Sequence, residues 1–203
     1  MEKILLASRN PGKAAEFRAL FAPFGAAILS LADFPGAPSP EETGASFEEN
    51  AVIKAEAAQR FAGILSLADD SGLAVEALGG APGVRSARFA GAGADDAANN
   101  RLLLEKLAGL PPERRRASFV CVLALASPAG RLRIFRGETH GRILSWPRGT
   151  GGFGYDPLFL SDDLGLTFAE AGSGAKGRVS HRGRAFAALA AELPACVGKA
   201  ERL

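Results

Sequence analysis

The chain alternates between short apolar runs and longer stretches in which apolar residues recur periodically. The run Ile4–Ala7 is continuous and apolar, which predicts a buried strand. Over residues 13–24, phenylalanine and leucine recur at spacings of three and four, and this period predicts a helix. A second short strand is expected over residues 27–31. A loop rich in proline and glycine is expected over residues 33–44.

A capping box marks the start of the next helix. The Ser46 hydroxyl is placed to accept a hydrogen bond from the Glu49 backbone N–H, and the Glu49 carboxylate is placed to reach back. The helix that follows is expected to end near Phe61. A third strand is predicted over residues 64–68, and it is expected to end at residues 69–72.

The second half of the chain contains further strands and helices. We expect a short strand over residues 73–77 and a helix over residues 95–107. A pair of strands is expected over residues 117–126 and 132–141, and a last helix over about residues 182–193. Strands and helices are mixed without strict alternation, which predicts an α/β fold with a central mixed sheet flanked by helices.

Composition excludes several classes of protein. The 203 residues are 47% hydrophobic and 23% charged, with no internal repeat or long linker. These values indicate one globular domain over residues 1–203. No apolar run reaches about 18 residues and no signal peptide is evident, so we expect no membrane contact. The net charge of +2 is spread widely, which argues against nucleic-acid binding. Cys121 and Cys196 have no metal-ligand spacing, so a zinc site is not expected and a reducing cytoplasm is the simplest location.

The turn between the first strand and the first helix is a candidate anion site. Backbone N–H groups at a helix start favour an anion, and a lysine adds charge suited to phosphate. The spacing of a Walker loop or a Rossmann fingerprint is absent. The alternative is a polar turn that only starts a helix. The residues of this turn are Ser8, Arg9, Asn10, Pro11, Gly12 and Lys13.

Two adjacent carboxylates, Asp69 and Asp70, follow an apolar strand. Ligands bind at the carboxyl ends of strands in open α/β sheets, and Mg²⁺ would relieve the repulsion between the two charges. The alternative is an Asp-Ser-Gly turn that closes a strand. Asn50 and Lys54 share one face of the following helix pattern, next to the Glu41–Gly44 segment. The alternative for this second group is a solvated helix face.

Two later segments carry further candidates. Residues 149–157 contain four glycines, which let backbone approach a ligand, and two aromatic residues with flat faces for a base. The alternative is a flexible hairpin. Lys176 and residues 180–184 lie near the start of the last helix, where backbone donors and Arg182 are placed to converge on an electronegative atom; the alternative is an ordinary helix cap. We expect Arg114–Arg116 to form a solvated turn.

Taken in order over nearly the whole chain, these segments resemble the inosine triphosphate pyrophosphatase (Ham1-like) family. The matching segments are residues 7–13, 41–44, 49–51, 68–73, 78–83, 149–157 and 180–183. The resemblance implies an elongated α/β fold with two lobes, an active-site cleft between them, and a homodimer. It also implies Mg²⁺-dependent hydrolysis of ITP, dITP and XTP to the monophosphate and pyrophosphate, which cleanses the nucleotide pool.

The resemblance also implies a role for each matching residue. Glu42 and Asp70 would hold the metal, and Asp70 would also accept the proton of the attacking water. The Ser8–Lys13 turn and Lys54 would bind the triphosphate. Donors from Arg182 or nearby backbone would pair with O6 of the purine and would be left unpaired against adenine. The remaining substrate-binding residues would be Ser71, Phe153, Gly154, Tyr155, Asp156, Lys176, His181 and Arg182.

Three other functions fit parts of the sequence. A related pyrophosphatase would act on modified pyrimidine nucleotides. A nucleotide-sensing module would bind without hydrolysis, but it would not need both Glu42 and Asp70. A nucleic-acid-binding module would show strongly salt-dependent affinity for DNA.

Overall fold

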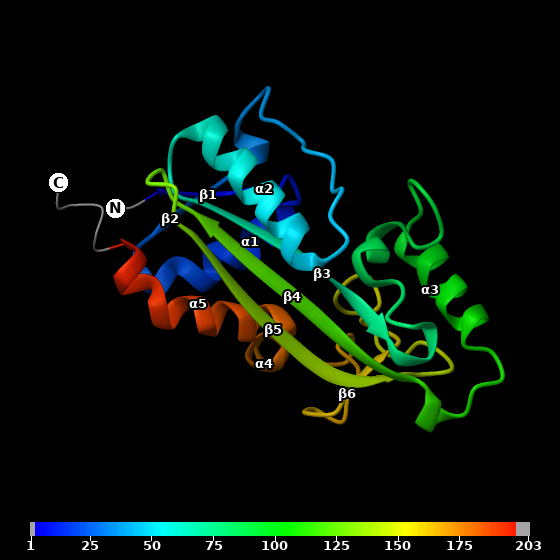
Figure 1. Cartoon of the computed structure of the whole chain (residues 1–203). Helices are drawn as coiled ribbons and strands as arrows, with labels where there is room; N and C mark the ends of the chain where they lie inside the picture. The colour runs from blue at the N-terminus through cyan, green and yellow to red at the C-terminus, as the bar shows by residue number, and fades with distance from the viewer. Residues whose placement is uncertain (1–2, 198–203) are drawn as a thin grey trace. The chain divides into compact units, whose positions relative to one another are not determined.

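The computed structural model describes residues 3–197 of the chain (Figure 1). The helices are α1 (Pro11–Phe21), α2 (Phe47–Ala62), α3 (Asp96–Lys106), α4 (Ser173–Val179) and α5 (His181–Val197). The strands are β1 (Lys3–Leu6), β2 (Ala27–Ser30), β3 (Ser66–Val75), β4 (Arg116–Ala126), β5 (Leu132–Ile143) and β6 (Phe159–Ser161).

The six strands form one sheet in the order β2-β1-β3-β4-β5-β6. Strand β1 pairs in parallel with β2 and β3, and β6 pairs antiparallel with β5. The prediction of an α/β fold with a mixed sheet flanked by helices is therefore confirmed. The pairing of the two long strands β4 and β5 was also predicted.

The described residues divide into two compact units. The first unit comprises residues 3–70, 122–136 and 185–197, and the second comprises residues 71–121 and 137–184. Each unit combines segments that are far apart in the sequence, and the long strand β3 passes from one unit to the next between Asp70 and Ser71. The single domain, the elongation and the position of a cleft stay predictions.

In the first unit, helices cover both faces of the β1–β2 edge, with α2 on one face and α1 and α5 on the other (Figure 1). Phe17 and Phe21 of α1 are fully buried, and the Phe21 ring contacts Phe186 of α5 edge to face at 4.9 Å. Helix α1 begins at Pro11 rather than at residue 13, because the Asn10 side chain caps it and proline suits the first helical position. Its last predicted turn is a 3-10 helix, Ala22–Phe24.

Helix α2 has the predicted N-cap. The backbone N–H of Glu49 donates to the Ser46 hydroxyl at 3.1 Å. The Glu49 carboxylate, however, accepts from the N–H of Ala45 at 2.6 Å rather than from that of Ser46, so the reciprocal half of the capping box was wrongly assigned. The α2 helix ends at Gly63, which adopts the left-handed conformation that glycine favours.

The predicted end of the third strand at residues 69–72 is wrong, and so is the alternative of a turn there, because β3 runs without a break from Ser66 to Val75. Asp69 and Asp70 are tolerated inside a buried strand because lysine side chains pair with both carboxylates. Gly72 also lies in the strand, and a Cβ atom there would lie 2.4 Å from the Ser86 hydroxyl oxygen. The glycine therefore permits close packing rather than a reversal of the chain.

The second unit has an aromatic core. The Phe119 ring meets Phe159 edge to face at 4.7 Å and stacks on Phe168 at 5.8 Å. The short elements β6 and α4 were not predicted, because three and seven residues are too few for a periodic pattern. Arg115 is buried and donates to the carbonyls of Leu107 and Leu110, so the expectation of a solvated turn was wrong for this residue.

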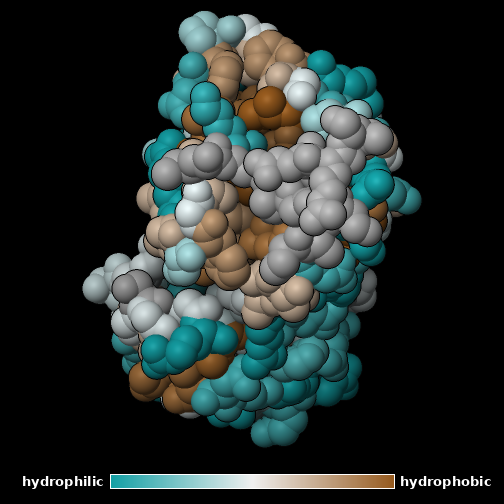
Figure 2. All heavy atoms as spheres, turned by 90° about the vertical axis from the view of Figure 1, so that its left-hand side faces the viewer, coloured by the Kyte–Doolittle hydropathy of each residue, from teal (hydrophilic) through white to brown (hydrophobic). Residues whose placement is uncertain are grey.

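Apolar and hydrophilic side chains are interspersed on the face that Figure 2 shows. Large exposed apolar residues of the first unit include Phe24 and Phe61. Cys121 is buried in β4, as expected for a core residue, while the Cys196 side chain lies outside the description. Within residues 3–197, no helix is long and apolar enough to cross a membrane.

Candidate functional site

In the first unit, Lys54 joins the two carboxylates that the sequence predicts as metal ligands. Its Nζ atom lies 2.7 Å from Oδ1 of Asp70 and 2.9 Å from Oε1 of Glu42. The Lys54 side chain is only 13% exposed and that of Asp70 only 10%. Lys54 is on α2, Asp70 is in β3 and Glu42 is in the loop before α2, so three separate segments build this cluster.

The charged groups of this cluster shift each other's pKa values. Burial alone would lower the pKa of Lys54, but the neighbouring carboxylates, above all Asp70, raise it. Burial raises the pKa of Asp70; Lys54 opposes this shift, and the negative charges of Glu42 and Asp69 add to it. The ionised form of Asp70 is therefore less favourable in the folded protein than in water. An additional positive charge nearby would stabilise this ionised form.

The donor set of this cluster fits a hard divalent cation that keeps water and phosphate ligands. Among the side chains that the structure describes, no group of three or more His, Cys, Asp or Glu residues is arranged for a metal. Mg²⁺ needs no such cage, because it binds through one or two carboxylates plus substrate phosphates. The Oδ2 atom of Asp70 is buried and has no hydrogen-bond partner among the described residues, so it is an unused acceptor.

The start of α2 holds the segment that carries Glu42. The backbone N–H of Gly44 donates to Oδ1 of Asn50 at 2.8 Å, and the next amide is held by Glu49. Asn50 is fully buried, four residues before Lys54 on the same helix face. A Cβ atom on Gly44 would lie 2.6 Å from Cβ of Glu49, so no larger residue fits. Asn50, a candidate of the sequence pattern, thus positions the Glu42 loop rather than facing solvent.

The predicted phosphate turn lies next to Asp69. The Lys13 ammonium pairs with Asp69, at 2.9 Å from Oδ1 and 2.8 Å from Oδ2, and the Asp69 side chain is almost fully buried. The N–H groups of Gly12 and Lys13 both donate to the Asn10 side chain, so the helix start is capped internally. The turn therefore offers a phosphate mainly the positive charge of Lys13, which Asp69 orients. The two backbone N–H groups at the helix start are already used by Asn10.

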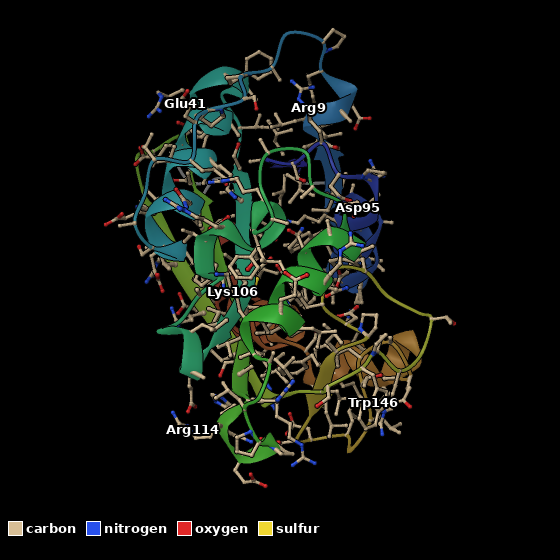
Figure 3. The ribbon with its side chains drawn as sticks, turned by 90° about the vertical axis from the view of Figure 1, so that its right-hand side faces the viewer. Arg9, Glu41, Asp95, Lys106, Arg114 and Trp146 are labelled. Carbon is tan, nitrogen blue, oxygen red and sulfur yellow. The ribbon has the colours of Figure 1, made fainter. Side chains whose placement is uncertain are left out.

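Arg9 of the same turn has a structural contact. Its guanidinium donates to the carbonyl oxygens of Leu31 at 3.1 Å and Ala37 at 2.7 Å. In Figure 3 its labelled side chain lies beside the segment that follows β2. Arg9 thus connects the segment after β2 to the turn by hydrogen bonds. Its position in the sequence did not indicate this role.

In the second unit, a separate cluster surrounds Phe153. The Lys176 ammonium forms an ion pair with the buried Asp156, and it lies 4.9 Å from the centroid of the Phe153 ring. The Phe153 backbone N–H donates to Oδ2 of Asp156 at 3.0 Å. The Arg182 guanidinium lies 6.0 Å from the centroid of the same ring, and Phe153 is 57% exposed. Phe153 is thus an exposed aromatic residue beside two cations, and an aromatic ring of this kind can stack on a nucleobase.

Three other predicted residues of this unit, Tyr155, His181 and Arg182, are buried. His181 stacks on the Phe119 ring at 4.8 Å, and Arg182 donates to the Ser71 hydroxyl at 3.3 Å. Tyr155 is 4% exposed and donates to the carbonyl of Ser86 at 2.8 Å. Burial, with a smaller contribution from Asp96, raises the pKa of Tyr155 far above its ordinary value. Tyr155 is therefore part of the core, whereas Phe153 is exposed to solvent.

Sequence reasoning missed two residues of α3 that contact this cluster. Asp96 and Asn100 both bind the backbone of Gly154. Two polar side chains four residues apart on a helix were the available signal, but it is also typical of a solvated face. Only the folded chain shows which loop they contact.

Comparison with known proteins identifies the family of the chain. The Ham1 family model matches residues 4–192, nearly the whole chain. The chain belongs to the Ham1 family. The predicted family resemblance is thereby confirmed, since every candidate segment lies inside the matched range.

Two curated members of the Ham1 family illustrate the similarity. The dITP/XTP pyrophosphatase of Geobacter sulfurreducens is 52% identical over 93% of this chain and 95% of its own length. The protein of the same name from Exiguobacterium sibiricum is 51% identical over 97% of this chain and 100% of its own length. The predicted enzyme class, a nucleoside-triphosphate pyrophosphatase, agrees with these names.

A solved Ham1 structure has the same fold. The HAM1 protein of Coxiella burnetii superposes with a TM-score of 0.89 at 41% identity, over 96% of this chain and 100% of that one. At this identity the comparison supports the family as well as the sheet and helix arrangement described above.

Proposed function

We propose that this Ham1 protein hydrolyses dITP, XTP and ITP to the nucleoside monophosphate and pyrophosphate. The observation that carries the proposal is the buried cluster in which Lys54 lies between Asp70 and Glu42, next to a second pair, Lys13 and Asp69. Two lysines and three carboxylates in one unit suit a polyphosphate accompanied by a divalent cation. The names of the curated relatives supply the substrate class.

The proposed reaction is the attack of water on the α-phosphorus. Asp70 accepts a proton from the water while the water oxygen bonds to the α-phosphorus. The bond from this phosphorus to the oxygen that bridges the α- and β-phosphates breaks. The electron pair of that bond leaves with pyrophosphate. Lys13 and Lys54 stabilise charge on the phosphate oxygens. Glu42 and Asp70 would hold Mg²⁺, which when bound supplies charge neutralisation and makes water more acidic.

We propose that the second cluster recognises the base. Phe153 offers the stacking surface, and Arg182 or a nearby backbone donor pairs with O6 of hypoxanthine or xanthine. Adenine has an amino group at that position, so the donor would be left unpaired, which strongly disfavours ATP. The other proposed substrate-binding residues, some of which act by holding these groups in place, are Ser8, Arg9, Asn10, Pro11, Gly12, Ser71, Gly154, Tyr155, Asp156, Lys176 and His181.

Two further properties belong to the proposal. We infer a homodimer, as the family resemblance implies, and sedimentation of the purified chain measures its mass in solution. We also retain one domain over residues 1–203. A single cooperative unfolding transition, observed equally by circular dichroism and by Trp146 fluorescence, supports it.

A panel of nucleoside triphosphates tests the function. The purified protein is incubated with Mg²⁺ and ITP, dITP, XTP, GTP, ATP, dUTP or dTTP, and pyrophosphate and phosphate are measured separately. We expect pyrophosphate from the first three and little product from ATP, dUTP and dTTP, while the GTP result measures how strongly a 2-amino group is disfavoured. Phosphate as the main product, or faster turnover of dUTP or dTTP than of dITP, would contradict the proposal.

A further inference from the structure

The N-terminal half of α3 binds one glycine of the second cluster through both of its backbone groups. The N–H of Gly154 donates to Oδ2 of Asp96 at 2.6 Å, and the carbonyl of Gly154 accepts from Nδ2 of Asn100 at 2.9 Å. Asp96 and Asn100 lie four residues apart and therefore on the same helix face. We call these two hydrogen bonds the Gly154 clamp. Figure 3 labels Asp95 and Lys106, which mark the two ends of α3.

The clamp acts on a segment that has little rigidity of its own. Gly152 and Gly154 both have positive φ values, 75° and 61°, which other residues adopt at a cost. Glycine loses more conformational freedom on folding than any other residue, so such a segment needs contacts that fix it. The two clamped groups belong to consecutive peptide units, one on each side of Gly154. Their hydrogen bonds therefore fix the backbone that immediately follows Phe153.

The orientation of Phe153 depends on this backbone. The backbone on the N-terminal side of Phe153 is also fixed, because the Phe153 N–H donates to the Asp156 carboxylate. Its ring is more than half exposed, with Lys176 over one part at 4.9 Å and Arg182 at 6.0 Å. An exposed ring with few packing contacts takes its position mainly from its own main chain.

Helix stabilisation alone explains Asp96 only in part. An acidic residue in the first turn interacts favourably with the helix dipole, but Asp95 already caps this helix by accepting from the Ala98 N–H. Asn100 is a weak helix former in the middle of α3, so the helix gains nothing from it. The Oδ1 atom of Asn100 is buried and has no hydrogen-bond partner among the described residues. The hydrogen bond from Nδ2 to Gly154 is therefore the contact that explains this side chain.

We propose that Asp96 and Asn100 are positioning residues that hold Phe153 ready for the purine base, and so set affinity for the base end of the substrate. The inference rests on the proposed function of the Phe153 cluster and adds residues outside it. A loop fixed before binding loses less entropy when the ligand arrives, so the clamp raises affinity without touching the ligand.

Two probes separate the base end of the substrate from its phosphate end. Inosine monophosphate carries the base without a triphosphate, and inorganic pyrophosphate carries phosphates without a base. Binding of each in the presence of Mg²⁺ is measured by calorimetry for the wild type, Asp96→Ala, Asn100→Ala and the double variant. We expect each single variant to bind inosine monophosphate about fivefold to tenfold more weakly and pyrophosphate within about twofold of wild type. The double variant should lose less than the product of the two, because both bonds hold one residue.

Three control variants make the test specific. Asp96→Asn keeps an acceptor for the Gly154 N–H and should recover most of the lost affinity. Asp95→Ala removes the α3 cap without touching Gly154, and Glu105→Gln changes a carboxylate at the far end of the same helix. Both should bind inosine monophosphate as the wild type does.

The outcomes distinguish the clamp from the proposed function. Equal losses for both probes, an effect of Asp95→Ala as large as that of Asn100→Ala, or no loss in the clamp variants would overturn the clamp. Failure of the wild type to bind inosine monophosphate would overturn it as well. A wild type that binds inosine monophosphate but releases no pyrophosphate from ITP would overturn the proposed function, while the binding comparison would still decide on the clamp.

Discussion

The Nζ atom of Lys54 lies 2.7 Å from Oδ1 of Asp70, and both side chains are nearly buried. The same ammonium lies 2.9 Å from Oε1 of Glu42. One cation thus keeps two carboxylates close together while leaving the second oxygen of Asp70 without a partner among the described residues. Such a cluster holds negative charge in place before a divalent cation or a substrate arrives, which is electrostatic preorganisation.

Removal of Lys54 should destabilise the metal-free protein. In Lys54→Met, two partly buried carboxylates lose their shared cation, and we expect the free energy of unfolding to fall by about 3 kcal/mol. Urea unfolding in the presence of a chelator measures this change. Mg²⁺ should restore part of the loss, because it binds the folded cluster. Arg60→Ala is the control, since Arg60 pairs with Glu56 on the surface and should change stability by less than about 0.5 kcal/mol.

Asp70→Asn should separate chemistry from binding. The amide keeps the size of the side chain but cannot accept the proton of the attacking water. We expect kcat for ITP to fall by about 10³-fold or more, with a KM within a few-fold of wild type. Glu56→Gln, a carboxylate-to-amide change on exposed α2 surface, should leave both constants unchanged. Wild-type kcat in Asp70→Asn would exclude Asp70 as the proton acceptor.

The stability of the metal-free protein should depend on the pKa of Asp70. This pKa is raised by burial, so the protonated form favours the folded state. The resulting stability is fully present below the ordinary aspartate pKa and is lost as the pH rises through the folded-state pKa. With a chelator present, wild type should therefore lose stability relative to Asp70→Asn as the pH rises from the ordinary aspartate pKa through the raised folded-state pKa. Parallel pH profiles of the two proteins would contradict this expectation.

Asp69 should act through Lys13. The carboxylate pairs with the Lys13 ammonium through both oxygens, which orients that charge. In Asp69→Asn we expect KM for ITP to rise about tenfold, because a charge-assisted bond of about 1.5 kcal/mol no longer holds Lys13 in place. Binding of inosine monophosphate should stay unchanged. Glu192→Gln, which alters an exposed ion pair with Arg133 in the same unit, should leave KM at the wild-type value.

Gly44 should tolerate no side chain. A Cβ atom there would lie 2.6 Å from Cβ of Glu49 and 2.7 Å from Oδ1 of Asn50, so the Glu42 segment must shift. In Gly44→Ala we expect half-maximal activity to require several-fold more Mg²⁺. Gly63→Ala is the comparison, because nothing lies within 4 Å of its Cβ position while its φ of 67° makes it strained. That variant should lose about 1 kcal/mol of stability and keep the wild-type Mg²⁺ requirement.

Local patterns predicted the elements that bury one periodic face. The apolar run of β1 and the capped start of α2 needed only neighbouring residues, so both were found. The continuity of β3 was not found, because two aspartates and a glycine in succession are typical of a turn. Their charges are compensated by Lys13 and Lys54, which are 56 and 16 residues away in the sequence.

The sequence by itself determined which residue types are candidates for the chemistry, namely the lysines, carboxylates and glycine-flanked aromatics of the Ham1 motifs. Tertiary structure decided their partners: Lys54 with Glu42 and Asp70, Lys13 with Asp69, and Gly154 with Asp96 and Asn100. The physical reason is one of range. Helix and strand periods act over a few residues, whereas ion pairs and side-chain bonds to loops depend on which distant segments the buried core brings together.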